Sequence, residues 1–176
     1  EMPVHEKITR LIEGPSHLYI LTEFTLFSLE KDTLSGLKRI DFAGRDRPLS
    51  FCEGNNNDLW LITARGRLHH IIQDSEPSVY QLQSDASLFY SAAIFVKEYS
   101  VLVAFGTIFS GVLIAQLVHD TIDFKESFTL TGHRGTVFDV QFHPAGTNVL
   151  FSCSDDRSVM KWDLDLRTGQ KFIGHE

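Results

Sequence analysis

The chain has 176 residues, 43% of them apolar and 22% charged, and these values are ordinary for a soluble globular protein. Its net charge of −7 opposes nonspecific binding to nucleic acid. Residues 1–10 are polar and no apolar core with a cleavage site follows, so no signal peptide is expected. Cys52 and Cys153 form no Cys-x-x-Cys pair, which favours reduced, buried thiols in an intracellular, cytoplasmic protein.

Short apolar strands recur in pairs along the chain. The first strand of each pair is predicted at 17–22, 58–64, 100–108 and 148–154. The second strand begins at Leu26, Leu68, Val112 and Val159, so successive starts are 42, 44 and 47 residues apart. Glycine-containing turns separate the pairs most clearly at 65–66 and 110–111. Regular spacing of this length indicates a repeated structural unit.

Residues 99–118 carry no charge and are long enough to cross a bilayer as a helix. Gly106, Ser110 and Gly111 interrupt this segment, and its branched residues fall into two short runs. A β-hairpin is therefore favoured over a membrane span.

The clearest repeat starts at Gly132-His133 and ends at Trp162-Asp163, and a second Gly-His pair follows 42 residues after the first, at 174–175. Between these points the pattern predicts strands at 136–142, 148–154 and 158–163. A period of about 40 to 45 residues bounded in this way is typical of one four-stranded blade of a β-propeller. The chain resembles the WD-repeat family.

That resemblance implies a hydrogen-bonded tetrad of His133, Ser152, Asp156 and Trp162. In it an ionised aspartate accepts from the imidazole, and the serine hydroxyl meets both the imidazole and the indole N–H. The same histidine, serine and aspartate could be mistaken for a hydrolase triad, but the tryptophan and the repeat spacing favour a structural role. The equivalent positions upstream are Leu29, Ile71 and Ala115, so apolar packing is expected to hold the other blades.

The predicted fold is all-β, a β-propeller of four-stranded antiparallel blades. About four blades are expected, as an incomplete portion of a larger propeller, because residues 174–176 begin a further repeat. A complete four-bladed ring is the alternative. The approximate blade boundaries are 15–42, 47–83, 88–130 and 134–173.

No catalytic site, metal site or cofactor is predicted. His69 and His70 are adjacent on a strand and point to opposite faces, so they cannot chelate one ion. The paired acids Asp155 and Asp156 fall at a turn and in the tetrad. The chain is therefore expected to be non-catalytic and to act by binding.

In WD-repeat propellers, partners dock on the top face, and the matching positions here are Thr136, Phe138 and Asp155. Phe138 is the strongest candidate, because an exposed aromatic side chain favours burial in a partner's pocket. Its alternative role is packing against the neighbouring blade. Arg157 is expected to form a local ion pair or to reach a phosphate.

Four arginines could together form a phosphate-contacting patch, despite the negative net charge. They lie in an inter-blade connection and beside a hairpin glycine: Arg45, Arg47, Arg65 and Arg67. The alternative is a scatter of solvated surface charges.

A narrower resemblance covers roughly 101–166. The segments 106–109, 132–138 and 154–162 are similar to those of WD-repeat proteins that serve as the non-catalytic subunit of the methyltransferase acting on the wobble ribose 2′-hydroxyl of tRNA. Ala115 departs from this pattern, where a tryptophan is usual.

This second resemblance implies a methyltransferase partner that brings S-adenosylmethionine and the catalytic groups. The propeller would bind that subunit and help to position tRNA. The competing function is a scaffold for protein partners alone, as in trafficking or a ligase complex, without RNA.

Overall fold

The computed structural model describes residues 7–14, 17–40, 46–54, 58–72, 75–82, 89–109, 111–118, 121–146 and 148–174, with only the backbone for 121–126. These residues form 16 β-strands in four antiparallel sheets of four strands each, and no helix occurs among them. The prediction of an all-β fold made of four-stranded antiparallel blades is confirmed. His175 and Glu176 lie outside the described residues.

The four sheets follow one another in chain order. The first contains β1 (Ile8–Glu13), β2 (His17–Thr22), β3 (Leu26–Glu30) and β4 (Lys38–Ile40). The second contains β5 (Pro48–Glu53), β6 (Leu59–Thr63), β7 (Arg67–Ile71) and β8 (Ser78–Gln81). The third contains β9 (Ser91–Val96), β10 (Ser100–Gly106), β11 (Gly111–Val118) and β12 (Thr121–Thr131). The fourth contains β13 (Val137–Phe142), β14 (Val149–Ser154), β15 (Ser158–Asp163) and β16 (Thr168–Ile173).

The first sheet begins at Ile8, ahead of the predicted blade boundary at residue 15. Its strand β1 reads ITRLIE and leaves Ile8 and Leu11 exposed, so its apolar pattern does not mark a buried face. Within each sheet, neighbouring strands pair in chain order, and each sheet is a simple meander. Local hairpins of this kind need only short turns between strands.

Turn chemistry fits these hairpins. Gly66 lies between β6 and β7 with a φ of 74°, a left-handed conformation that glycine adopts without steric cost. Arg157 takes a similar φ of 64° between β14 and β15, and its amide donates to the carbonyl of Ser154 at 3.2 Å. This conformation is uncommon for a residue with a Cβ.

The apolar core consists of three clusters, each lying between consecutive sheets. Between the first and second sheets the cluster contains Leu21, Leu26, Phe51 and Leu61. Between the second and third it contains Ile62, Leu68, Val103 and Phe105, together with Ala115. Between the third and fourth it contains Ala104, Ile114, Leu150 and Trp162. Each sheet therefore packs face to face on its neighbour, as blades of a propeller do.

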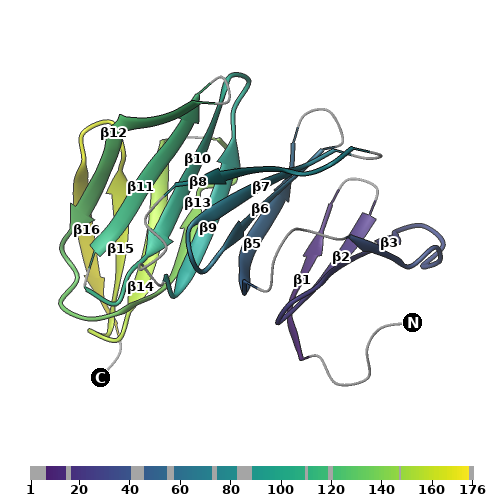
Figure 1. Ribbon diagram of the computed structural model, residues 1–176. Coiled ribbons are helices and arrows are strands. Elements are labelled where there is room, and N and C mark those ends of the chain that lie inside the picture. The colour runs from purple at the N-terminus through teal and green to yellow at the C-terminus, as the bar shows by residue number, and fades with distance from the viewer. Residues whose placement is uncertain are drawn as a thin grey trace.

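The first strand of each sheet lies on the inner side of this arrangement. Strand β9 contacts both β5 and β13, and Figure 1 shows the sheets following one another across the molecule from purple to yellow. An ion pair joins β1 to β13, with Arg10 Nη2 3.1 Å from Asp139 Oδ1. The inner strands of the first and fourth sheets thus come within reach of each other.

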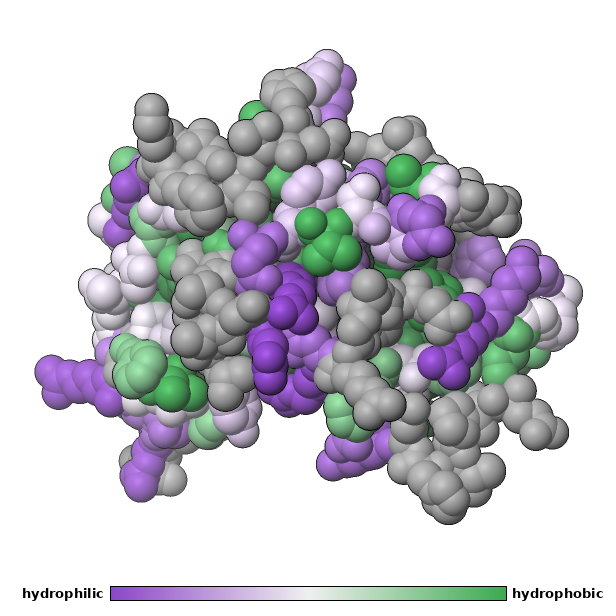
Figure 2. Space-filling model, viewed as in Figure 1, coloured by the Kyte–Doolittle hydropathy of each residue, from purple (hydrophilic) through white to green (hydrophobic). Residues whose placement is uncertain are grey.

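Within 99–118, β10 and β11 pair as antiparallel neighbours, which confirms the hairpin prediction. In the part of the chain that the structure describes, no helix has the length and apolar character needed to span a bilayer. Figure 2 shows hydrophilic and hydrophobic residues interspersed on one face of the molecule, with hydrophilic residues gathered near its middle.

Candidate functional site

The fourth sheet brings the four predicted tetrad residues together. Trp162 Nε1 donates to Ser152 Oγ at 2.8 Å, and Ser152 Oγ lies 2.8 Å from His133 Nε2. His133 Nδ1 lies 3.2 Å from Asp156 Oδ1 and equally far from Ser158 Oγ. A neutral histidine with its proton on Nδ1 donates to Asp156 and accepts from Ser152. Each polar side-chain group of the tetrad then has a hydrogen-bond partner.

Protonation favours the same arrangement. Burial lowers the pKa of His133, against the opposing effect of the Asp156 carboxylate, so the imidazole is neutral at pH 7. Burial opposes ionisation of Asp156, but hydrogen bonds from Lys171, Ser158, the amide of Arg134 and His133 outweigh it and hold the pKa of that carboxyl far below its usual range. The carboxylate is committed to these donors and is not available as a base.

Tight packing surrounds the tetrad. The Trp162 side chain is among the largest that are fully buried, and it lies edge-on to His133 with ring centroids 6.1 Å apart. Ser152 is also buried. A substrate has no access to the hydroxyl of Ser152, so these residues hold β14 and β15 to the segment before β13 and stabilise the sheet.

The second sheet has a polar core of its own, which the sequence pattern did not reveal. Thr63 Oγ1 donates to Asp46 Oδ2 at 2.5 Å, and both side chains are buried. The amide of Arg65 also donates to Asp46, at 3.3 Å, and the amide of Arg67 donates to Thr63 Oγ1 at 3.3 Å. This sheet therefore relies on polar contacts as well as on the apolar packing expected for it.

Of the three predicted partner-binding residues, Phe138 and Asp155 are exposed and Thr136 is half-buried. The amide of Asp155 donates to the carbonyl of Thr136 at 3.1 Å, which places these two at one end of the sheet. Phe138 is 44% exposed and lies against Tyr90 of the third sheet, with ring centroids 5.2 Å apart. Its ring thus packs on the neighbouring sheet and still faces solvent.

A β-bulge gives Phe138 this direction. The register between β13 and β14 shifts between Val137 and Asp139, so Phe138 has no partner across the ladder. The same shift occurs in the first and second sheets, at the positions of Thr9 and Leu49. The bulge therefore recurs in β1, β5 and β13, whereas β9 pairs with β10 without a shift.

Further exposed apolar side chains lie near Phe138. The amide of Val137 donates to the carbonyl of Thr107 at 3.0 Å, which brings the turn between β10 and β11 beside the start of β13. That turn carries Phe109, whose side chain is 85% exposed. We call Tyr90, Phe109 and Phe138 the aromatic rim, and of these three only Phe138 belongs to the positions that the repeat motif indicates.

The four arginine candidates are distributed unevenly. Arg45 lies outside the described residues. Arg47 and Arg65 are both exposed. The amide of Ala64 donates to the carbonyl of Arg47 at 2.8 Å, so the two arginines lie at the same end of the second sheet. Arg67 is half-buried, and its Nε donates to Gln81 at 3.2 Å.

The remaining candidates are the histidines, the cysteines and Arg157. His69 is buried, whereas His70 stacks on Trp60 at 3.9 Å and pairs with Asp58. Among the residues that the structure describes, no three side chains of the kinds that bind metals gather at one point. Both cysteines are free thiols. Arg157 is exposed.

Comparison with known proteins supports the repeat. Residues 124–163 match the model of the family described as WD domain, G-beta repeat. This segment is similar to a WD repeat. The match spans most of β12, all four tetrad residues and β13 to β15.

Three curated relatives share part of this chain, and all three bear the name nuclear distribution protein PAC1. The protein of Candida tropicalis is 40% identical over 53 residues, which cover 30% of this chain and 11% of that protein. The protein of Komagataella phaffii is 38% identical over 61 residues, covering 33% and 12%. That of Candida albicans is 38% identical over 53 residues, covering 30% and 11%. The matched region thus spans about a tenth of these relatives.

Proposed function

We propose that this chain is part of a non-catalytic WD-repeat scaffold that binds the catalytic subunit of a tRNA 2′-O-methyltransferase and helps to position tRNA. The partner supplies S-adenosylmethionine and the catalytic groups. The scaffold contributes orientation, which lowers the entropic cost of bringing one ribose hydroxyl to the methyl donor.

The observation that carries this proposal is the contact between two motif segments. The turn at 106–109 and the segment 132–138 belong to the narrower sequence resemblance, and the backbone of Thr107 bonds directly to that of Val137. Gly106 permits this approach, since a Cβ there would lie 2.7 Å from the carbonyl oxygen of Val137. Together the segments form most of the aromatic rim, and exposed aromatic residues of this kind commonly anchor protein interfaces.

The RNA contact is proposed for the end of the second sheet that carries the arginines. Arg47 and Arg65 are exposed there, and Arg67 lies beside them. The net charge of −7 opposes general affinity for nucleic acid, but a local group of arginines can still contact phosphates. Arg45 belongs to the same proposal on sequence grounds.

A protein-interaction scaffold without RNA is the second candidate, for trafficking or a ligase complex. The relatives favour it, because they are named for nuclear distribution and none of the three is named for tRNA. In this case the aromatic rim binds a protein, and the arginines are solvated surface charges.

A pulldown separates the two candidates. The tagged chain is purified from cells, bound proteins are identified by mass spectrometry, and bound RNA is sequenced. The first candidate requires a methyltransferase together with tRNA, whereas proteins without a methyltransferase or tRNA contradict it and support the second.

Matched variants then test the two surfaces. Phe138→Ala should lower recovery of the methyltransferase, whereas Tyr99→Ala, at an exposed tyrosine in the turn between β9 and β10, should not. The double variant Arg47→Glu with Arg65→Glu should lower tRNA recovery without affecting the protein partner. Lys161→Glu, at an exposed position on β15, is its control.

A further inference from the structure

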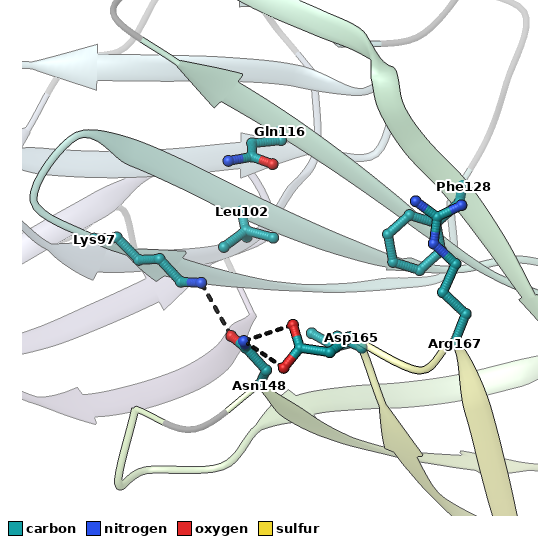
Figure 3. Close-up of a pocket in the computed structure, with 8 residues that line it drawn as sticks. Lys97, Leu102, Gln116, Phe128, Asn148, Asp165 and Arg167 are labelled. Atoms are coloured by element: carbon teal, nitrogen blue, oxygen red, sulfur yellow. Dashed lines mark hydrogen bonds between the residues drawn. The ribbon is translucent and has the colours of Figure 1, made fainter.

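A cavity of about 220 Å³ lies between the third and fourth sheets, at the opposite end of the strands from the aromatic rim. The third sheet contributes Lys97, Gln116 and Phe128, and the fourth sheet contributes Asn148, Asp165 and Arg167 (Figure 3). Leu102 lies behind them, so an apolar floor is surrounded by polar groups. Five of the eight lining residues are polar or charged, so a ligand here would be held mainly by polar contacts.

A chain of hydrogen bonds fixes one side of the cavity. Lys97 Nζ donates to Asn148 Oδ1 at 3.0 Å, and Asn148 Nδ2 donates to both carboxylate oxygens of Asp165, at 2.8 and 2.9 Å. The chain crosses from one sheet to the other. An ammonium group has three N–H donors, so Lys97 keeps donors for a ligand while its position is held.

An aromatic stack forms the other side. The guanidinium of Arg167 lies over the ring of Phe128, 4.3 Å from its centroid (Figure 3). Arg167 takes a φ of 53° in the turn between β15 and β16, which directs its side chain back toward the third sheet. A planar guanidinium held on one face by an aromatic ring offers its other face for stacking.

The charges select for an anionic ligand. Among the described residues no carboxylate forms an ion pair with Lys97 or Arg167, and the one carboxylate of the lining, Asp165, accepts both of its recorded bonds from Asn148. Two cations therefore face one carboxylate. The net positive charge is local, in a chain whose overall charge is −7.

We infer that this pocket binds a single nucleotide of an RNA strand. The base stacks on the Arg167 guanidinium and bonds to the amide of Gln116, and its phosphate binds Lys97. Stacking on planar side chains together with phosphate contacts is how proteins bind unpaired nucleotides. The cavity is smaller than the roughly 300–1,000 Å³ of most small-molecule pockets, so it admits one base and its phosphate rather than a large cofactor.

A protein carboxylate is the competing ligand. It would satisfy Lys97 but leave the guanidinium face and the amide of Gln116 without a use, so the nucleotide fits the lining better. That the nucleotide comes from RNA rests on the function proposed above; the affinity of the pocket for a nucleotide does not.

The test is a titration of the chain with four probes. These are AMP, GMP, inorganic phosphate and an acidic peptide, each followed by calorimetry. AMP or GMP should bind at one site at least tenfold more tightly than phosphate. Lys97→Met and Arg167→Lys should each weaken nucleotide binding about tenfold or more, because the first removes the phosphate contact and the second removes the planar stacking surface.

Lys161→Met is the matched control and should bind nucleotides as the unmodified chain does. Urea midpoints of all variants establish that each is folded. Equal affinity for phosphate and nucleotide, tighter binding of the acidic peptide, or no binding would each overturn the inference.

The outcomes are separable from those of the pulldown. If the chain binds a nucleotide but recovers no tRNA, the pocket is supported and the proposed function is refuted. If the chain recovers tRNA with a methyltransferase but binds no nucleotide, the proposed function is supported and the pocket inference is refuted.

Discussion

Replacing Ser152 by alanine removes the hydroxyl that links Trp162 to His133. The indole N–H is then left buried without an acceptor, and His133 Nε2 loses its donor, since both bonds of 2.8 Å end on that hydroxyl. Each buried polar group left unsatisfied costs about 1–3 kcal/mol, so the loss of both bonds should lower the free energy of unfolding by about 2–6 kcal/mol. That is a large part of the roughly 5–15 kcal/mol that stabilises a typical domain.

The assay is urea unfolding at pH 7, with Ser78→Ala as the control, because Ser78 is exposed on β8 and should cost less than about 0.5 kcal/mol. A double-mutant cycle with Trp162→Phe measures the specific bond. In the phenylalanine background the indole donor is absent, so Ser152→Ala should cost about 1–2 kcal/mol less. Equal costs in both backgrounds, or a Ser152→Ala cost no larger than that of the control, would refute the structural role assigned to the tetrad.

Three further predictions follow from the packing and protonation of the chain. The pKa values of His133 and Asp156 in the folded chain both lie below their usual ranges, so the unfolded chain binds more protons than the folded chain. Urea midpoints should therefore fall as the pH drops below about 6.5, and fall further below about pH 4. A urea midpoint that does not change with pH would contradict this. Gly106→Ala should destabilise by about 1–3 kcal/mol, because its Cβ would press on a carbonyl of β13, whereas Gly174→Ala, with nothing within 4 Å, should have almost no effect on thermal unfolding. Burial, aided by nearby carboxylates, raises the pKa of Cys52 to about 12, so at pH 8 its alkylation should be slow in the folded chain and rapid in urea, as mass spectrometry would show; equal rates would argue for an accessible thiolate.

Sequence periodicity was sufficient for the fold class, because hairpin strands with alternating burial leave a local signal. Strands β14 and β15 illustrate this, since buried and more exposed positions alternate along nearly their whole length. Strand β1 gave no such signal, because most of its side chains face solvent. The bulges at Thr9, Leu49 and Phe138 were also missed, since a pattern of period two cannot show where a ladder skips a residue.

The candidate sites also differ in whether the sequence could indicate them. The tetrad residues fall within one repeat and could be named from a motif. The Asp46–Thr63 pair joins residues 17 apart that belong to no motif, and the nucleotide pocket joins turns of two different sheets. Tyr90 and Phe109 were overlooked for that reason too: their proximity to Phe138 depends on how the third sheet packs on the fourth.

The position of the apolar clusters between sheets has a consequence for synthesis on the ribosome. When the first sheet emerges, Leu21 and Leu26 have nothing to pack against until Phe51 and Leu61 of the second sheet follow. The same holds for each later sheet and its successor. A pair of neighbouring sheets is therefore the smallest length of nascent chain that can bury such a cluster, and a pause in translation within a pair would leave an apolar face open to chaperones or to misassembly.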